Sequence, residues 1–272
     1  MTIRYLNIEV VLGVVALAQL ASFTLGRPLT ASWYIVVALV VWSVYTIDRI
    51  IDARNPSTTP LTGRHQFHAR HRTILLTLAS GALCVSAVTA VIFFPFRYWI
   101  AALPLGTLTL AHLAMQRTST RWMSIIKDVN VAITYTLAAW VIPVADDFYY
   151  HTHRLDLTAS AVLLSSMLLV AIDVIMLSRY ERDHDSSGGW PSISVALGPQ
   201  KTRLVLVTLR VTVAMIAAFV VMRQDALIAL TLLAMTAAYT ILERWKIKRI
   251  DDARLAIDAV LLLPLILLLF SS

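Results

Sequence analysis

The chain has 272 residues, of which 58% are hydrophobic and only 14% are charged, with a mean hydropathy of +0.75. Soluble domains carry about 25% charged residues, so this composition excludes an ordinary soluble protein. The net charge of +7 is typical of a membrane protein whose basic loops face anionic lipid. We find no nucleic-acid-binding motif, and the single cysteine, Cys84, excludes an intrachain disulfide.

Nine apolar stretches are each long enough to cross a bilayer, whose hydrocarbon core needs roughly 20 helical residues. In chain order they cover residues 8–26, 32–50, 73–94, 97–115, 125–144, 158–178, 203–222, 225–242 and 255–270. They are continuously apolar rather than alternating, which favours helices over barrel strands. We therefore expect an all-α polytopic membrane protein that forms a single domain over residues 1–272.

Lysine and arginine are divided unequally between the two ends of these spans. The N-terminus and the loops after even-numbered spans carry eighteen of them, the opposite loops carry four, and Arg210 lies within the seventh span. Because cytoplasmic loops are the ones enriched in Lys and Arg, we expect a cytoplasmic N-terminus and an outer C-terminus. The predicted location is a bacterial inner membrane.

Acidic residues gather at the ends of the second and sixth spans, where two long polar loops begin. The first acidic cluster is Asp48 and Asp52, in YTIDRIID; the second acidic cluster is Glu181, Asp183 and Asp185, in SRYERDHD. A spacing of four residues places two helical carboxylates on one face, a turn apart. The two clusters therefore look like equivalent positions in an internal repeat of one four-helix unit.

Carboxylates brought together repel one another unless a cation lies among them. Mg²⁺ binds through one or two carboxylates and completes its shell with waters and substrate phosphates. The two clusters therefore predict Mg²⁺ bridged to a diphosphate. Neighbouring bases would contact the phosphate oxygens, and the candidates are Arg64, Arg70, Arg72, Lys127 and Arg182. The alternative is that these groups only face water at helix ends.

These sequence features resemble the UbiA superfamily of intramembrane prenyltransferases, and the resemblance extends over nearly the whole chain. That family's first motif is N-D-x-x-D-x-x-x-D, and Asp48 and Asp52 match its last two acids in VYTIDRIID. The segment that follows is echoed by Asn55, Thr58, Pro60, Leu61 and Gly63.

The second family motif, D-x-x-x-D-x-x-x-G, is similar to Glu181, Asp185 and Gly189, and Lys127 occupies the position of a diphosphate-contacting lysine. The chain departs from the first motif at Val44 and Tyr45, where the family usually has Asn and Asp. Neither side chain replaces a carboxylate as a ligand for a hard cation.

The resemblance implies nine helices around a central cavity open to the cytoplasmic side. It also implies Mg²⁺ held by Asp48, Asp52, Glu181 and Asp185, with Asp183 between the last two. The implied reaction moves an isoprenyl group from a prenyl diphosphate, drawn from the membrane, to a lipophilic or aromatic acceptor. Aromatic rings would stabilise the allylic cation, and the candidates are Tyr45, Trp42, Tyr135 and Trp140.

Asp173, two helical turns before Glu181, has two interpretations. It would position the acceptor or take its proton, as a catalytic residue alongside Tyr45. Alternatively, it pairs with Arg210 in the seventh span, for which Asp258 is another possible partner, because charges buried in a membrane usually pair.

Three other functions are compared with prenyl transfer. A membrane terpene cyclase of the same superfamily would trap the cation with the substrate's own double bond. A non-catalytic isoprenoid-binding protein is favoured by Val44 and Tyr45. A transporter is disfavoured, because the polar residues gather at the cytoplasmic end and not at the bilayer midplane. His65, His68 and His71 recur every third residue and suggest either a zinc site or a helix that faces phosphate or lipid.

Overall fold

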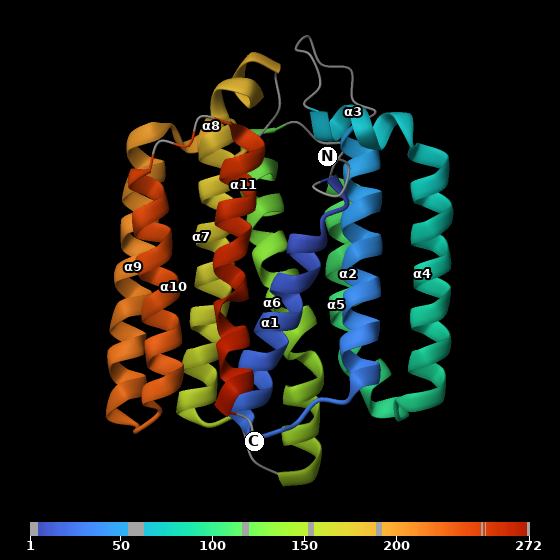
Figure 1. Ribbon diagram of the computed structural model, residues 1–272, viewed down its shortest axis with the longest axis vertical. Coiled ribbons are helices and arrows are strands. Elements are labelled where there is room, and N and C mark those ends of the chain that lie inside the picture. The colour runs from blue at the N-terminus through green and yellow to red at the C-terminus, as the bar shows by residue number, and fades with distance from the viewer. Residues whose placement is uncertain are drawn as a thin grey trace.

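The computed structural model describes residues 5–53, 63–115, 120–151, 155–188, 192–245, 247 and 249–270. All regular structure in these ranges is helical, and nine of their helices are long and apolar enough to cross a membrane (Figure 1). The prediction of an all-α, multi-pass membrane protein is therefore confirmed. The spanning helices are α1 (Ile8–Leu25), α2 (Ala31–Asp52), α4 (Arg72–Phe93), α5 (Phe96–Met115), α6 (Arg121–His151), α7 (Leu157–Gly188), α9 (Pro199–Met222), α10 (Ala226–Arg244) and α11 (Ile250–Asp258), which continues as the 3₁₀ helix η2 (Ala259–Phe270).

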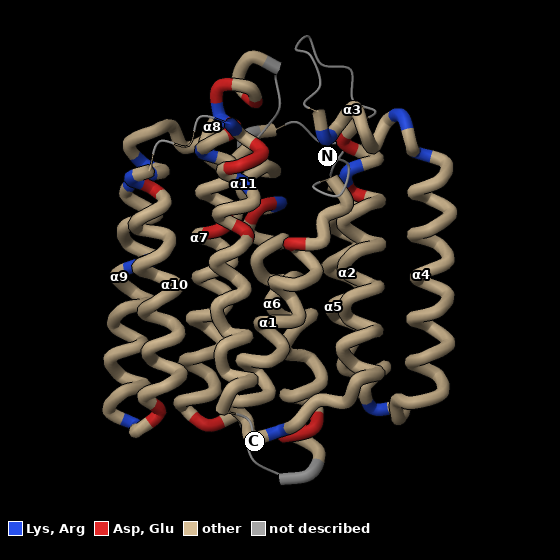
Figure 2. The backbone as a smooth tube through the Cα atoms, viewed as in Figure 1, with Lys and Arg blue, Asp and Glu red and all other residues tan. Residues whose placement is uncertain are grey.

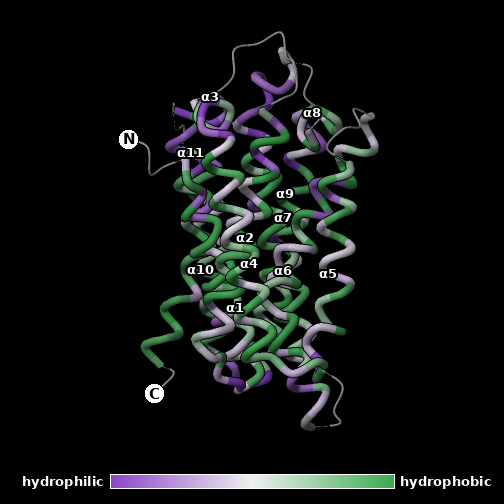
Figure 3. The backbone as a smooth tube through the Cα atoms, turned by 90° about the vertical axis from the view of Figure 1, so that its right-hand side faces the viewer, coloured by the Kyte–Doolittle hydropathy of each residue, from purple (hydrophilic) through white to green (hydrophobic). Residues whose placement is uncertain are grey.

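One end of the bundle, which we call the polar end, carries the N-terminus and two short helices, α3 (Gly63–Arg70) and α8 (Ile193–Leu197). Figure 2 shows that most Lys, Arg, Asp and Glu lie at or near this end, and the C-terminus lies at the other. Between the ends the helices are mainly hydrophobic (Figure 3). This division is the one expected for helices whose middle lies in hydrocarbon.

Helix α1 lies at the centre of the bundle, where it packs against α2, α6 and η2. Helices α7, α9 and α10 pack on one side of it, and α2 and α4 form a pair on the other (Figure 1). The C-terminus of α1 is closed by Gly26, whose φ of 60° is left-handed and whose N–H bonds to the Phe23 carbonyl at 3.3 Å. Helix α9 begins at Pro199, a position where the missing N–H breaks no bond.

The outer faces of α4, α5 and α9 expose large apolar side chains, among them Ile92, Leu103 and Met215. Contiguous apolar surface of this extent is not stable in water and indicates contact with lipid or another hydrophobic partner. The described residues therefore form an integral membrane protein.

Arg210 is buried in α9 and pairs with Glu243 of α10, while its Nε donates to the Leu206 carbonyl at 3.0 Å. The expected pairing with Asp173 or Asp258 is wrong. Helices α9 and α10 are neighbours joined by a short turn, so Glu243 lies beside Arg210. Asp173 instead accepts a hydrogen bond from Tyr239 of α10 at 3.0 Å.

The Arg210–Glu243 pair predicts a large loss of stability when one partner is removed. Glu243→Ala leaves the Arg210 guanidinium buried and unpaired, and should lower the free energy of unfolding by about 3 kcal/mol. The matched control is Arg179→Ala, since Arg179 also bonds Glu243 but its side chain is 41% exposed; its loss should cost below about 1 kcal/mol. Thermal unfolding in detergent measures both, and equal effects would contradict the assignment.

Candidate functional site

A cavity of about 250 Å³ opens near the polar end, between α2, α5, α6, α7 and α11. Its inner wall is apolar, and its outer part is lined by carboxylates, bases and hydroxyls. The apolar lining comes from Val40, Val41, Val44, Leu105, Val131, Ala138, Val174 and Leu177. The cavity is therefore amphipathic along the membrane normal, with charge at one end only.

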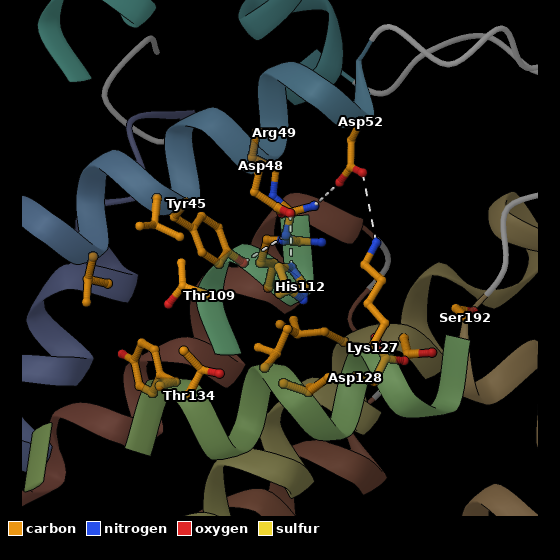
Figure 4. A pocket seen from close by; sticks show the side chains of 18 of the residues that line it. Tyr45, Asp48, Arg49, Asp52, Thr109, His112, Lys127, Asp128, Thr134 and Ser192 are labelled. Atoms are coloured by element: carbon orange, nitrogen blue, oxygen red, sulfur yellow. Dashed lines mark hydrogen bonds and ion pairs between the residues drawn. The ribbon is translucent and has the colours of Figure 1, made fainter. Parts of the chain in front are cut away.

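The first acidic cluster lies in the last turns of α2, and both of its carboxylates are buried at the cavity wall (Figure 4). Asp48 pairs with His112 of α5, with 3.1 Å between Oδ1 and Nε2. Asp52 accepts from Arg49 Nη1 at 3.1 Å, and Lys127 Nζ of α6 lies 4.0 Å from its other oxygen. Each carboxylate of this cluster therefore already has a basic partner supplied by the protein.

Tyr45 and Arg49, one turn apart on α2, form a second contact within this group. Arg49 Nη2 donates to the Tyr45 hydroxyl at 2.9 Å, and its guanidinium carbon lies 4.7 Å from the centre of the Tyr45 ring. Both side chains line the cavity. The position where the resemblance leads one to expect a carboxylate thus carries an aromatic ring that orients an arginine.

The second acidic cluster reaches the same cavity from α7. Glu181 lines the cavity and accepts a hydrogen bond from Arg254 of α11, which also lines it. Asp185, one turn later, lines the cavity and forms no ion pair within the part of the chain that the structure describes. Asp183 is exposed and lies outside the lining. Four of the five predicted acids thus meet at one cavity.

Several predicted residues do not lie at the cavity, and their roles stay predictions. Arg70 and Arg72 are exposed, and Arg182 also lies outside the lining. Arg64 is buried against α1, where it donates to Asn7. Asp173 likewise lies outside the lining, held by Tyr239.

Of the four aromatic candidates, Tyr45 and Tyr135 line the cavity. Trp42 donates to the Leu6 carbonyl at 2.9 Å, and Trp140 is part of the buried core. The motif positions Asn55, Thr58, Pro60, Leu61 and Gly189 lie outside the described residues.

Sequence reasoning missed Arg49, His112, Asp128 and Arg254, all of which line the cavity. Arg49 and Arg254 are two of the eighteen basic residues that the sequence places at the predicted cytoplasmic end. Asp128 directly follows Lys127, and its carboxylate accepts the Ile193 N–H at 3.0 Å, which ties α8 to α6. An available signal was that each of the four lies within one turn of a predicted span end.

The two acidic clusters differ in how well they would hold a metal. Among the described residues, no three Asp, Glu, His or Cys side chains lie close enough together to hold an ion by themselves. The carboxylates of the first cluster bind protein bases and do not fit. Asp185, beside Glu181, fits Mg²⁺, which needs only one or two carboxylates when phosphates and waters complete its shell.

His65 of α3 faces the cavity above these groups. Burial, and secondarily the positive charge of Arg49, lower the pKa of His65 to about 3. The imidazole is therefore neutral near pH 7 and adds no charge to the cavity.

These features define a class of protein, a polytopic helical membrane protein built around an amphipathic cavity near one end. Among solved structures, the fold is similar to the apo structure of a UbiA homolog from Aeropyrum pernix K1, with a TM-score of 0.61 and 16% sequence identity. The likeness covers 95% of this chain and 98% of that one. No family model and no curated protein matches the sequence. The chain has the UbiA fold, so the resemblance is confirmed at the level of the fold.

The pKa of His65 predicts acid sensitivity. Between pH 6.5 and pH 3 the unfolded chain binds a proton at this residue that the folded chain does not, so stability falls as the pH is lowered. Between pH 8 and pH 5.5, the free energy of unfolding should fall by up to about 1.4 kcal/mol less in His65→Gln than in wild type. Above pH 8 the free energy of unfolding should not depend on pH through this residue in either protein. Unfolding curves from pH 8 to pH 5 measure the effect, and parallel pH profiles would disprove it.

Tyr135 predicts a steric constraint at Gly13 of α1. The Tyr135 hydroxyl donates to the Val10 carbonyl, and a Cβ at Gly13 would lie 2.6 Å from that hydroxyl oxygen. Gly13→Ala should therefore destabilise by about 1–3 kcal/mol. Gly81→Ala is the control, because a Cβ at Gly81 meets open space, and it should stabilise by up to about 1 kcal/mol. Melting temperatures that change in the same direction would contradict the packing.

Proposed function

We propose that the protein is an intramembrane prenyltransferase, which moves an isoprenyl group from a prenyl diphosphate to a lipophilic or aromatic acceptor. The amphipathic cavity carries this proposal. Its apolar wall would accept a hydrocarbon chain, and its polar end places Lys127, Arg254 and Arg49 where an anionic head group would lie. The likeness to a UbiA homolog supports the fold that this activity requires.

The chain's own residues would act in two ways. Lys127, Arg49 and Arg254 would bind the diphosphate and stabilise the charge that grows on it as the carbon–oxygen bond breaks. The ring of Tyr135 would face the allylic carbocation left behind, which aromatic surfaces stabilise, whereas the Tyr45 ring lies against the Arg49 guanidinium. The surrounding valines and leucines exclude water, which would otherwise capture this cation. An acceptor carbon or oxygen then forms the new bond and releases a proton.

We further propose Mg²⁺ as the cofactor, held chiefly at Asp185, next to Glu181, together with diphosphate oxygens. Bound there, the ion would neutralise the diphosphate and make it a better leaving group. Asp185 is the more available ligand, because Glu181 already binds Arg254. The polar end is proposed to face the cytoplasm of a bacterial inner membrane, since the Lys and Arg surplus lies there.

Product analysis separates this function from its alternatives. Purified protein in lipid is incubated with farnesyl diphosphate, Mg²⁺ and a lipid extract as the source of acceptors. Diphosphate release that depends on the extract supports transfer, and release with a cyclic hydrocarbon in its absence identifies a cyclase. Tight binding without release would identify a non-catalytic isoprenoid-binding protein. The physical reason would be that the carboxylates of the first acidic cluster already bind protein bases.

The cavity predicts which basic residues bind the donor. Lys127→Ala should weaken binding of farnesyl thiodiphosphate, a non-hydrolysable analogue, by roughly 10-fold or more, because it removes a charge-assisted contact. Arg72→Ala removes the same formal charge from an exposed position outside the cavity and should bind within about twofold of wild type. Equal losses would show that only the overall charge matters.

A further inference from the structure

The first acidic cluster already contains its own cation. Arg49 bonds Asp52 at 3.1 Å, and Lys127 approaches the same carboxylate at 4.0 Å. Asp48 is occupied by His112 at 3.1 Å. A divalent ion placed between Asp48 and Asp52 would therefore lie beside Arg49 and Lys127, and this like-charge repulsion opposes its binding.

We infer that the Arg49 guanidinium takes the place of a metal ion at the first acidic cluster and contacts the diphosphate directly. The inference rests on the proposed function and specifies its binding site. It assigns the site one divalent ion, at Asp185, and none at the first acidic cluster. Arg49 is accordingly a substrate-binding residue, with Tyr45 and Asp52 as its positioning residues.

The contacts of Arg49 leave it able to bind an anion. One Nη1 donor goes to Asp52 and one Nη2 donor goes to the Tyr45 hydroxyl, which fixes the plane of the guanidinium over the Tyr45 ring. A guanidinium carries five N–H donors in a rigid fork that matches phosphate oxygens. Two donors on the terminal nitrogens thus remain beyond its contacts with the part of the chain that the structure describes, and the side chain lines the cavity.

Arg254 of α11 supplies a second, independent sign of an anionic ligand in the cavity. It is 9% exposed and lines the cavity. One of its terminal nitrogens binds Glu181, whereas the other, Nη1, is buried with no hydrogen-bond partner among the described residues. Leaving such a charged donor unsatisfied is costly, so a rearrangement of the Arg254 side chain that brings Nη1 to an acceptor in the cavity would be favoured. Arg49 and Arg254 both line the cavity, so an anionic head group bound there would have donors from α2 and from α11.

The departure from the family motif at Tyr45 follows from this arrangement. An aspartate in place of Tyr45 would add a third carboxylate one turn before Arg49 and remove the ring over which the guanidinium lies. Tyrosine instead provides a neutral hydrogen-bond acceptor and an aromatic face, both of which suit a cation. The altered motif thus favours a built-in guanidinium over a bound metal ion.

The number of bound metal ions tests the inference without measuring activity. Wild-type protein is titrated with Mn²⁺ in the presence of saturating farnesyl thiodiphosphate, and free Mn²⁺ is measured by electron paramagnetic resonance. We expect one Mn²⁺ per chain in wild type and in Asp52→Asn, and none in Asp185→Asn. Two ions per wild-type chain, or loss of the ion in Asp52→Asn, would overturn the inference.

Variants of Arg49 test the direct contact. Arg49→Gln should weaken analogue binding by roughly 10- to 100-fold with the Mn²⁺ count unchanged, because it removes a charged hydrogen-bond donor. Arg49→Lys should restore part of the affinity, and Arg179→Gln, outside the cavity, should match wild type. Unchanged affinity in Arg49→Gln would overturn the inference. Failure of wild type to bind the analogue with any metal would instead refute the proposed function itself.

Discussion

The pairing of charges buried between helices is the constraint on which the rest of this structure depends. A charge within a membrane protein is costly unless a partner on a neighbouring helix compensates it. Asp48 of α2 pairs with His112 of α5, and Glu181 of α7 pairs with Arg254 of α11. Lys127 reaches from α6 toward Asp52. These pairs join α2 to α5 and α6, and α7 to α11, and all five helices surround the cavity, so the same contacts position the helices and prepare the site.

The cavity exists because charge and apolar surface are separated along the same helices. Helix α2 presents Val40, Val41 and Val44 to the inner part of the cavity and its charged residues to the outer part. Such a shape suits a ligand with an anionic head and a hydrocarbon chain, because each part meets surface of its own kind. The bases that would hold the head group are already oriented by carboxylates, so binding would require little reorganisation of side chains.

The helices could be predicted accurately because their cause is local. A run of about 20 apolar residues has no alternative to a helix in lipid, since each backbone N–H and C=O must bond within the segment. The ends of the spans agree closely with the prediction for α1, α2 and α4, and differ most for α6 and α7, whose helices extend several residues past the apolar run. Polar residues can continue a helix beyond the membrane, and a span predicted from hydropathy ends before them.

The candidate site could be predicted only in part, because pairing depends on which helices are neighbours. The sequence by itself determined the nine spans, the polar end and the two acidic clusters, since hydropathy and i, i+4 spacing are properties of single segments. Only the tertiary structure decided that Arg49 and Arg254, and not Arg70 and Arg72, reach the cavity, and that Arg210 pairs with Glu243. Residues far apart in the chain become partners through helix packing, and their separation in the sequence does not predict their distance in space.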